Sequence, residues 1–211
     1  MDFKYEKTLR FNVGKHLKGK SYLKPDDERY LLSGRVVVEE KMDGRQAVVD
    51  SEKFIFCVED LERRHSVAYR IPARFAVFDV VDKETHLFLA RADKKEVVRY
   101  FMANRAQLPA QLSNGGIFLV PLIEAGMFMV NDLAGLMKDR GVSAYAMNPD
   151  TREPSFMEGI VVKPDRCLLV MEQLRGKIVR TELLEGLTSE QLRKTAAPNE
   201  IDRSLFPNGF R

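Results

Sequence analysis

The sequence is poor in the side chains that form zinc sites and cysteine-based catalytic centres. It has two cysteines and three histidines, and neither type occurs at the spacing of zinc ligands. Cys57 and Cys167 each lie in an apolar, strand-like run, so we expect both to be buried, unreactive thiols. The sequence therefore gives no support to a zinc protein or to catalysis by a cysteine–histidine pair.

Long apolar runs and a strong excess of one charge are also absent. No segment approaches the roughly 18 apolar residues that a membrane-spanning helix requires. Residues 1–7 are charged rather than apolar, unlike the start of a signal peptide. We therefore expect a cytoplasmic protein without a membrane partner. The net charge of +3 does not by itself indicate binding to nucleic acid.

Hydrophobic alternation predicts an α+β protein built on antiparallel sheet, with helices beside it. Apolar and β-branched runs predict strands over residues 35–40, 46–50, 54–58, 66–71, 75–81, 86–90, 117–123, 160–163, 167–171 and 177–181. Apolar stripes predict helices over 93–107, capped by Asp93, and over 131–140, capped by Asn131. We divide the chain into a polar segment (1–33, with a turn at 24–27), a main domain (34–185), and a short helix (189–195) with its tail (186–211).

Two short segments, more than a hundred residues apart, combine a lysine with nearby carboxylates. They are Glu-Lys-Met-Asp-Gly-Arg at 40–45 and Glu-Gly-Ile-Val-Val-Lys at 158–163, and each adjoins a β-branched run. The first segment alone is also compatible with a strand–turn–strand hairpin that has Asp-Gly at its turn. Three further segments follow a related pattern: an apolar strand ending in Glu59, Phe-Ala-Val-Phe-Asp-Val at 75–80, and Leu-Arg-Gly-Lys-Ile-Val-Arg at 174–180.

In this order the five segments resemble motifs I, III, IIIa, IV and V of the covalent nucleotidyltransferase superfamily. Its members include ATP-dependent polynucleotide ligases and mRNA-capping enzymes. The segment at 174–180 is most similar to the RNA-ligase version of motif V. The resemblance covers residues 35–181 and implies an antiparallel-sheet-rich, ATP-grasp-like nucleotidyltransferase domain with flanking helices. The chain beyond it is too short for the OB-fold domain of DNA ligases.

The resemblance also implies a role for particular residues. Lys41 would bond covalently to AMP from ATP, while Lys163 and Lys177 would favour its neutral form and neutralise phosphate oxygens. Glu158 would bind Mg²⁺, with Mn²⁺ able to replace it. Glu59 would hydrogen-bond the ribose, and the base would stack on Phe78 or on Phe75, because three residues apart on a strand they face opposite sides. Further nucleotide contacts would come from Glu40, Asp43, Gly44, Arg45, Gln46 and Arg180, with the ribose contact of Arg45 or Gln46 left open.

The expected function is that of an ATP-dependent RNA ligase. It would form lysyl-AMP, transfer AMP to a 5′-phosphate end and seal that end to a 3′-hydroxyl. The alternatives are a DNA ligase or capping guanylyltransferase core, and a non-catalytic nucleotide- or RNA-binding module. The partners would be RNA ends, with a further protein able to supply end binding. Clustered cations are either solvated surface or contacts to phosphates, namely Lys15, Lys18, Lys20, Lys24, Arg63, Arg64 and His65.

Overall fold

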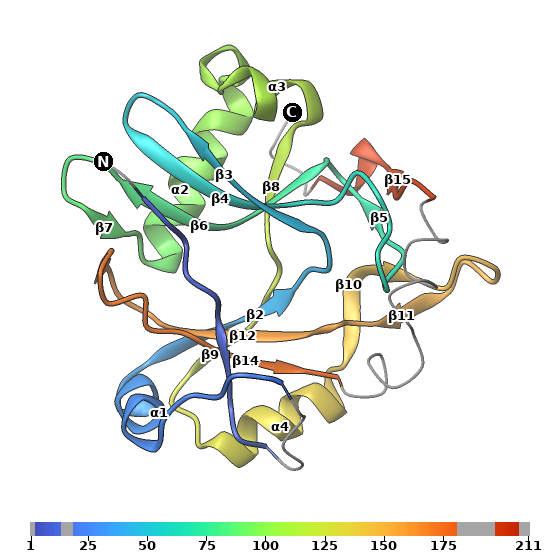
Figure 1. Ribbon diagram of the computed structural model, residues 1–211. Coiled ribbons are helices and arrows are strands. Elements are labelled where there is room, and N and C mark those ends of the chain that lie inside the picture. The colour runs from blue at the N-terminus through green and yellow to red at the C-terminus, as the bar shows by residue number, and fades with distance from the viewer. Residues whose placement is uncertain (1–2, 14–18, 181–196, 207–211) are drawn as a thin grey trace.

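Two β-sheets face each other, and helices cover their outer faces (Figure 1). This computed structural model describes residues 3–13, 19–180 and 197–206. The architecture is α+β, with mostly antiparallel strands and few helices, as the sequence predicts. No helix in these ranges is long and apolar enough to span a membrane.

The first sheet has five strands, and its outer face is covered by two helices. Its order is β1 (Leu9–Arg10), β14 (Gly176–Val179), β12 (Gly159–Pro164), β2 (Val36–Lys41) and β9 (Leu122–Gly126). Neighbours are antiparallel except β1 and β14. Alternate apolar residues such as Val36 and Val38 pack in one core with Leu31 of α1 (Pro25–Leu32) and Leu133 of α4 (Val130–Asp139).

The second sheet packs its outer face on α2 (Arg91–Ala103) and α3 (Ala110–Gly115). Its order is β13 (Leu168–Leu169), β7 (Leu87–Phe88), β6 (Phe75–Asp82), β4 (Phe54–Asp60) and β3 (Arg45–Asp50), with β8 (Ile117–Leu119) parallel to β6. Phe56 and Val77 share a core with Val98, Phe101 and Leu112 from the two helices. Shorter elements complete the described chain: β5 (Arg70–Ile71) with β15 (Glu200–Ile201), β10 (Val142–Met147) with β11 (Pro154–Phe156), and the 3₁₀ turns η1 (Arg105–Gln107) and η2 (Arg203–Leu205).

Strand alternation directs polar residues into the space between the sheets. In β2, Val36 and Val38 face the helices, so Glu39 and Lys41 face inward. Cross-strand pairing then places Val161 between Glu39 and Lys177, and Gly159 beside Lys41. Residues of three separate sequence segments, β2, β12 and β14, therefore meet on one inner face.

A β-bulge in β6 determines which phenylalanine faces the interior. Cys57 pairs with Asp79 but the next residue, Val58, pairs with Val77, so Phe78 is an extra residue in β6. The bulge brings Phe78 and Asp79 to the inner face together. Phe75 lies in the outer core instead, so of the two rings Phe78 is the one on the inner face.

Several predicted element ends are wrong. Helix α2 begins at Arg91 with Ala90 as its N-cap, so Asp93 lies in the first turn and does not cap it. Helix α4 begins after Met129, whose backbone N–H donates to the Asp132 carboxylate at 2.7 Å, so Asn131 is not the cap. The predicted strand over 66–71 is reduced to β5, and the predicted helix at 189–195 lies outside the described residues.

Other elements differ because of single residues or tertiary pairing. The predicted strand over 117–123 is divided at Pro121, and its halves, β8 and β9, belong to different sheets. Helix α1 occupies 25–32, where only a turn was predicted, and Pro25 stands at its first position. Strands β10 and β11, which the sequence did not predict, pair across the connection formed by residues 148–153.

We expect Gly159→Ala to destabilise the protein by about 1–3 kcal/mol, because a Cβ at residue 159 would collide with the Ile178 carbonyl oxygen. Gly135→Ala is the matched control. Gly135 lies in α4 with open space around it, and alanine should stabilise that helix by about 0.5–1 kcal/mol. Chemical denaturation of both variants measures the two changes. A Gly159→Ala protein as stable as the wild type would show that the strands can separate at no cost.

Candidate active site

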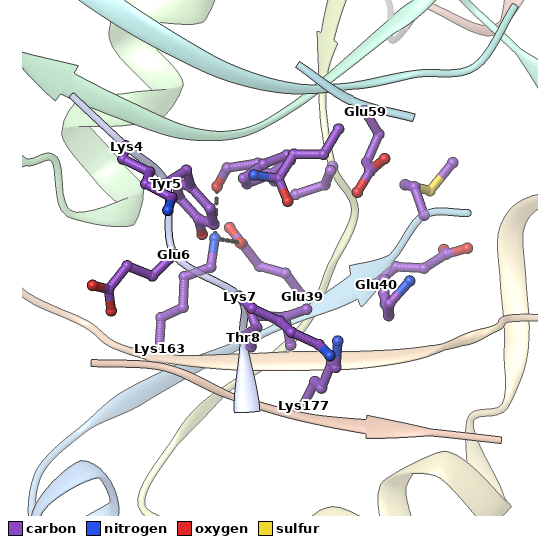
Figure 2. A pocket seen from close by; sticks show the side chains of 16 residues that line it. Lys4, Tyr5, Glu6, Lys7, Thr8, Glu39, Glu40, Glu59, Lys163 and Lys177 are labelled. Carbon is purple, nitrogen blue, oxygen red and sulfur yellow. Dashed lines mark hydrogen bonds and ion pairs between the residues drawn. The ribbon is translucent and has the colours of Figure 1, made fainter. Parts of the chain in front are cut away.

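A pocket of about 740 Å³ lies between the two sheets (Figure 2). Seven residues predicted for the site line it: Glu40, Lys41, Gln46, Glu59, Phe78, Lys163 and Lys177. The remaining wall includes residues 4–8 of the N-terminal segment, which the sequence did not assign to the site. The pocket is therefore formed by both sheets and by a segment that crosses between them.

Lys41 is held by Glu158 at the pocket wall. The Lys41 ammonium forms an ion pair with Glu158 Oε2, and the two side chains are 20% and 11% exposed. Burial lowers the pKa of Lys41, but the charge of Glu158 outweighs it, with smaller contributions from Glu59 and Asp43, and raises the pKa above its ordinary value. The expectation that neighbouring cations favour a neutral Lys41 is therefore wrong for this arrangement. Lys41 is a charged, paired amine here.

Glu59 carries a buried carboxylate oxygen with nothing to bind. Its Oε2 is buried without a hydrogen-bond partner in the described part of the protein, while the Glu59 side chain lines the pocket. Burial, opposed by Lys41, raises the pKa of Glu59 to about 7. A buried acceptor without a donor costs free energy. A hydroxyl donor on a ligand would remove that cost.

A buried group of charges, here called the bridging cluster, joins the two sheets beneath the pocket. Its members are Glu39, Asp79, Arg91, Lys94 and Lys163. Lys163 Nζ donates to Glu39 Oε2 at 2.8 Å, to Asp79 Oδ1 at 2.8 Å and to the Phe78 carbonyl at 2.6 Å. Lys94 Nζ donates to Glu39 Oε1 at 2.8 Å and to the same carbonyl at 2.6 Å. Arg91 also forms an ion pair with Glu39 Oε1.

The bridging cluster fixes the charge of its members. Burial would raise the pKa of Glu39, yet Lys163, Lys94 and Arg91 together lower it far below its ordinary value. Burial lowers the pKa of Lys163, but Asp79 and Glu39 outweigh it and raise the pKa. Lys163 thus reaches the pocket as a charged residue whose three donors are already engaged. It is placed to hold the sheets together rather than to contact a phosphate directly.

Asp43 and Glu40 orient the strand end that carries Lys41. The Asp43 carboxylate accepts from the Ser66 backbone N–H at 2.7 Å and from the Ser66 hydroxyl. The Glu40 carboxylate accepts from the Ser143 hydroxyl and from the Ala144 backbone N–H at 3.1 Å. These contacts position the backbone on both sides of Lys41. A Cβ at Gly44 would lie 2.7 Å from the Asp60 carbonyl oxygen. The backbone at residue 44 can therefore lie this close to Asp60 only if that residue is glycine.

Lys177 lines the pocket at a place where nearby cations outweigh the charge of Glu158. Burial, with added repulsion from Lys41, Arg10 and Lys7, lowers its pKa to about 8. No carboxylate in the described ranges forms an ion pair with Lys7, Arg10 or Lys177. This part of the pocket is suited to an anion.

Five predicted site residues lie outside the pocket lining, namely Asp43, Gly44, Arg45, Glu158 and Arg180. Arg45 is exposed and pairs with Asp60 at 3.3 Å, whereas its neighbour Gln46 lines the pocket. Arg180 donates to the Met137 carbonyl at the end of α4 and stacks on the Phe156 ring at 4.6 Å. Lys15 and Lys18 lie outside the described residues.

No group of three or more metal-binding side chains occurs within the described ranges. Glu158 alone suits a magnesium ion that is held mainly by ligand phosphates, as is common for this ion. Cys57 is buried as predicted, while Cys167 is only partly buried and lies 3.7 Å from Asp93 Oδ2. Comparisons with protein-family models, with curated proteins and with solved structures found no match.

We expect Glu59→Gln to change the pH dependence of stability. The folded-state pKa of about 7, against an ordinary 4.5, gives wild type a stabilisation that is full below about pH 4.5 and lost as pH rises through about 7. The variant lacks this loss, so its free energy of unfolding relative to wild type should rise by about 1–3 kcal/mol between pH 5 and pH 8. Urea denaturation at both pH values measures it.

Glu52→Gln, on an exposed turn, controls for the loss of a surface carboxylate. Its difference from wild type should stay the same at pH 5 and pH 8. An equally constant difference for Glu59→Gln would mean that Glu59 is not strained by burial.

Proposed function

We propose that this protein is an ATP-dependent RNA ligase that works through a lysyl-AMP intermediate on Lys41. One observation carries the proposal: a buried amine, paired with Glu158, lines a nucleotide-sized pocket together with an aromatic ring, a carboxylate and a second lysine. Each of these groups corresponds to one requirement of nucleotidyl transfer. They come from the segments that resemble motifs I, III, IIIa and V, with Glu158 from motif IV.

The pocket offers groups for each part of ATP. The Phe78 ring provides an apolar surface for the base. The Glu59 carboxylate, which lines the pocket, would accept a hydrogen bond from a ribose hydroxyl. Lys177 would contact phosphate oxygens. Glu158 would hold a magnesium ion, which would supply positive charge to the phosphates.

The proposed first reaction is attack by Lys41 Nζ on the α-phosphorus of ATP. A nitrogen–phosphorus bond forms, the bond from that phosphorus to the bridging oxygen breaks, and its electron pair leaves with pyrophosphate. The amine must first release its proton to solvent. Because Glu158 raises the pKa of Lys41, engagement of Glu158 by other groups would favour the neutral amine. AMP then passes to a 5′-phosphate, and a 3′-hydroxyl displaces it to seal the strand.

Lys163 would act by positioning other residues of the site. Lys163 holds Glu39, Asp79 and the Phe78 carbonyl together, so it would set the position of the base-binding ring. This assigns Lys163 a positioning role in place of direct phosphate contact. Glu40 would act in a similar way, because Ser143 and Ala144 already occupy its carboxylate.

We expect Lys41→Ala and Lys41→Arg to abolish covalent labelling by ATP. Alanine removes the nucleophile, and arginine keeps the charge beside Glu158 but stays protonated. The measurement is acid-stable transfer of label from α-labelled ATP in the presence of magnesium, with EDTA as the negative condition. Lys95→Ala, an exposed lysine on α2, should be labelled as wild type.

Wild-type labelling of either Lys41 variant would remove the proposed nucleophile. Labelling of the wild type by GTP and not by ATP would identify a guanylyltransferase core. No labelling by either nucleotide would leave a non-catalytic binding module. Circular dichroism of the Lys41→Arg protein should match wild type, which separates lost chemistry from lost fold.

We expect the protein to seal nicks that have RNA on at least one side of the junction. An A-form junction displays 2′-hydroxyls that distinguish it from DNA. The assay compares all-RNA, all-DNA and mixed nicks, together with single-stranded RNA, at one salt concentration. Sealing should fall steeply as salt rises, because phosphate contacts dominate such binding. Equal or better sealing of the all-DNA nick would identify a DNA ligase core.

A further inference from the structure

The N-terminal strap, defined as residues 3–10, crosses the pocket from one sheet to the other (Figure 1). At one end Phe3 packs against Phe88 of the second sheet, with ring centroids 5.9 Å apart. At the other end β1 pairs with β14 of the first sheet. Between them, Tyr5 lies edge-on to Phe78 at 5.0 Å and donates a hydrogen bond to Asp79. The strap is therefore part of the pocket wall.

Two residues just before β14 anchor the strap. Gln173 accepts from the Glu6 backbone N–H and donates to the Lys4 carbonyl, both at 2.8 Å. Arg175 donates to the Glu6 carbonyl at 2.6 Å, and its guanidinium lies 3.7 Å from the centre of the Tyr5 ring. Gln173 has a φ of 37°, a region that side chains other than glycine rarely adopt. A buried arginine and a strained backbone are thus used to hold this short segment in place.

The anchored strap directs cations at Lys177. Arg10 pairs in register with Lys177 across β1 and β14, so both side chains leave the sheet on the same face. Lys7 lines the pocket, and its side chain extends toward the same region as that of Lys177 (Figure 2). Burial and the charge of Lys41 lower the pKa of Lys177 most, and repulsion from Arg10 and Lys7 adds to the shift.

Like charges brought together without a counter-ion raise the free energy of the folded protein. No described carboxylate pairs with these three side chains. Glu158 forms its ion pair with Lys41, and its charge offsets only part of the repulsion at Lys177. A ligand with several negative charges close together would relieve the repulsion, and a polyphosphate has that form.

We propose that Lys7 and Arg10 of the strap, with Lys177, bind the β- and γ-phosphates of ATP and stabilise pyrophosphate as it leaves. This inference rests on the proposed function. As the nitrogen–phosphorus bond to Lys41 forms, the bond to the bridging oxygen breaks and negative charge grows on the β-phosphate. Lys7, which lines the pocket, and Arg10, which pairs in register with Lys177, would neutralise that charge. The strap is then a catalytic part of the first reaction and takes no part in the last one.

The test separates the reaction that uses the β- and γ-phosphates from one that does not. Lys7→Ala/Arg10→Ala should reduce the rate of labelling by ATP on the order of a hundredfold. The same protein should seal RNA that already carries a 5′-adenylate at nearly the wild-type rate, since the 3′-hydroxyl displaces AMP without pyrophosphate. Lys7→Arg should retain labelling. Lys53→Ala/Lys95→Ala, two exposed lysines elsewhere, controls for the loss of two positive charges.

Unchanged labelling by the double variant would overturn the inference and leave the ligase proposal standing. Equal loss of labelling and of adenylated-RNA sealing would also overturn it, because the strap would then contact RNA or support the fold. Lys7→Ala alone, at an exposed residue, answers the question if the double variant does not fold. Calorimetry with inorganic tripolyphosphate tests the subsite without catalysis: wild type should bind it, and the double variant should bind at least about tenfold more weakly. Absence of wild-type labelling refutes the ligase proposal, whereas absence of tripolyphosphate binding refutes this inference.

Discussion

The bridging cluster determines the geometry on which the pocket depends. Glu39 and Lys163 come from one sheet, Asp79 from the other, and Arg91 and Lys94 from the helix behind it. Two carboxylates face three cations away from water, and burial lowers the pKa of Lys94 to about 8. Removing one partner of such a buried set leaves an uncompensated charge, which commonly costs about 3–5 kcal/mol. The distance between the sheets is therefore fixed by charge pairing as well as by packing.

Much of this inner face could be predicted from the sequence because strands have a period of two. Once the apolar residues of β2 and β12 are assigned to the helices, Glu39, Lys41 and Lys163 must face the other sheet. The same rule argues against Arg180, because it stands three residues after Lys177 and so faces away from it. Spacing alone could thus have corrected that assignment.

Features that depend on a single interruption of the pattern could not be predicted in the same way. The bulge at Phe78 is defined by the pairing of β6 with β4. It can be predicted only if it is known which strands pair. The division of the predicted strand at Pro121 could be predicted only if it were known that β8 and β9 join different sheets. The strap was beyond prediction for a similar reason. Its strand β1 spans only Leu9–Arg10, and its anchor Arg175 comes from far along the chain.

The electrostatic surroundings of Lys41 and of Lys177 differ. The difference constrains how a ligand can lie in the pocket. Around Lys41 the carboxylates of Glu158, Glu59 and Asp43 dominate and keep the amine charged. Around Lys177 the cations Lys41, Arg10 and Lys7 outweigh the opposing charge of Glu158. A nucleoside triphosphate entering the pocket would meet acceptors suited to ribose hydroxyls near Lys41 and donors suited to phosphates near Lys177. In the proposed reaction, Lys41 would attack the α-phosphorus of a nucleotide held in that orientation.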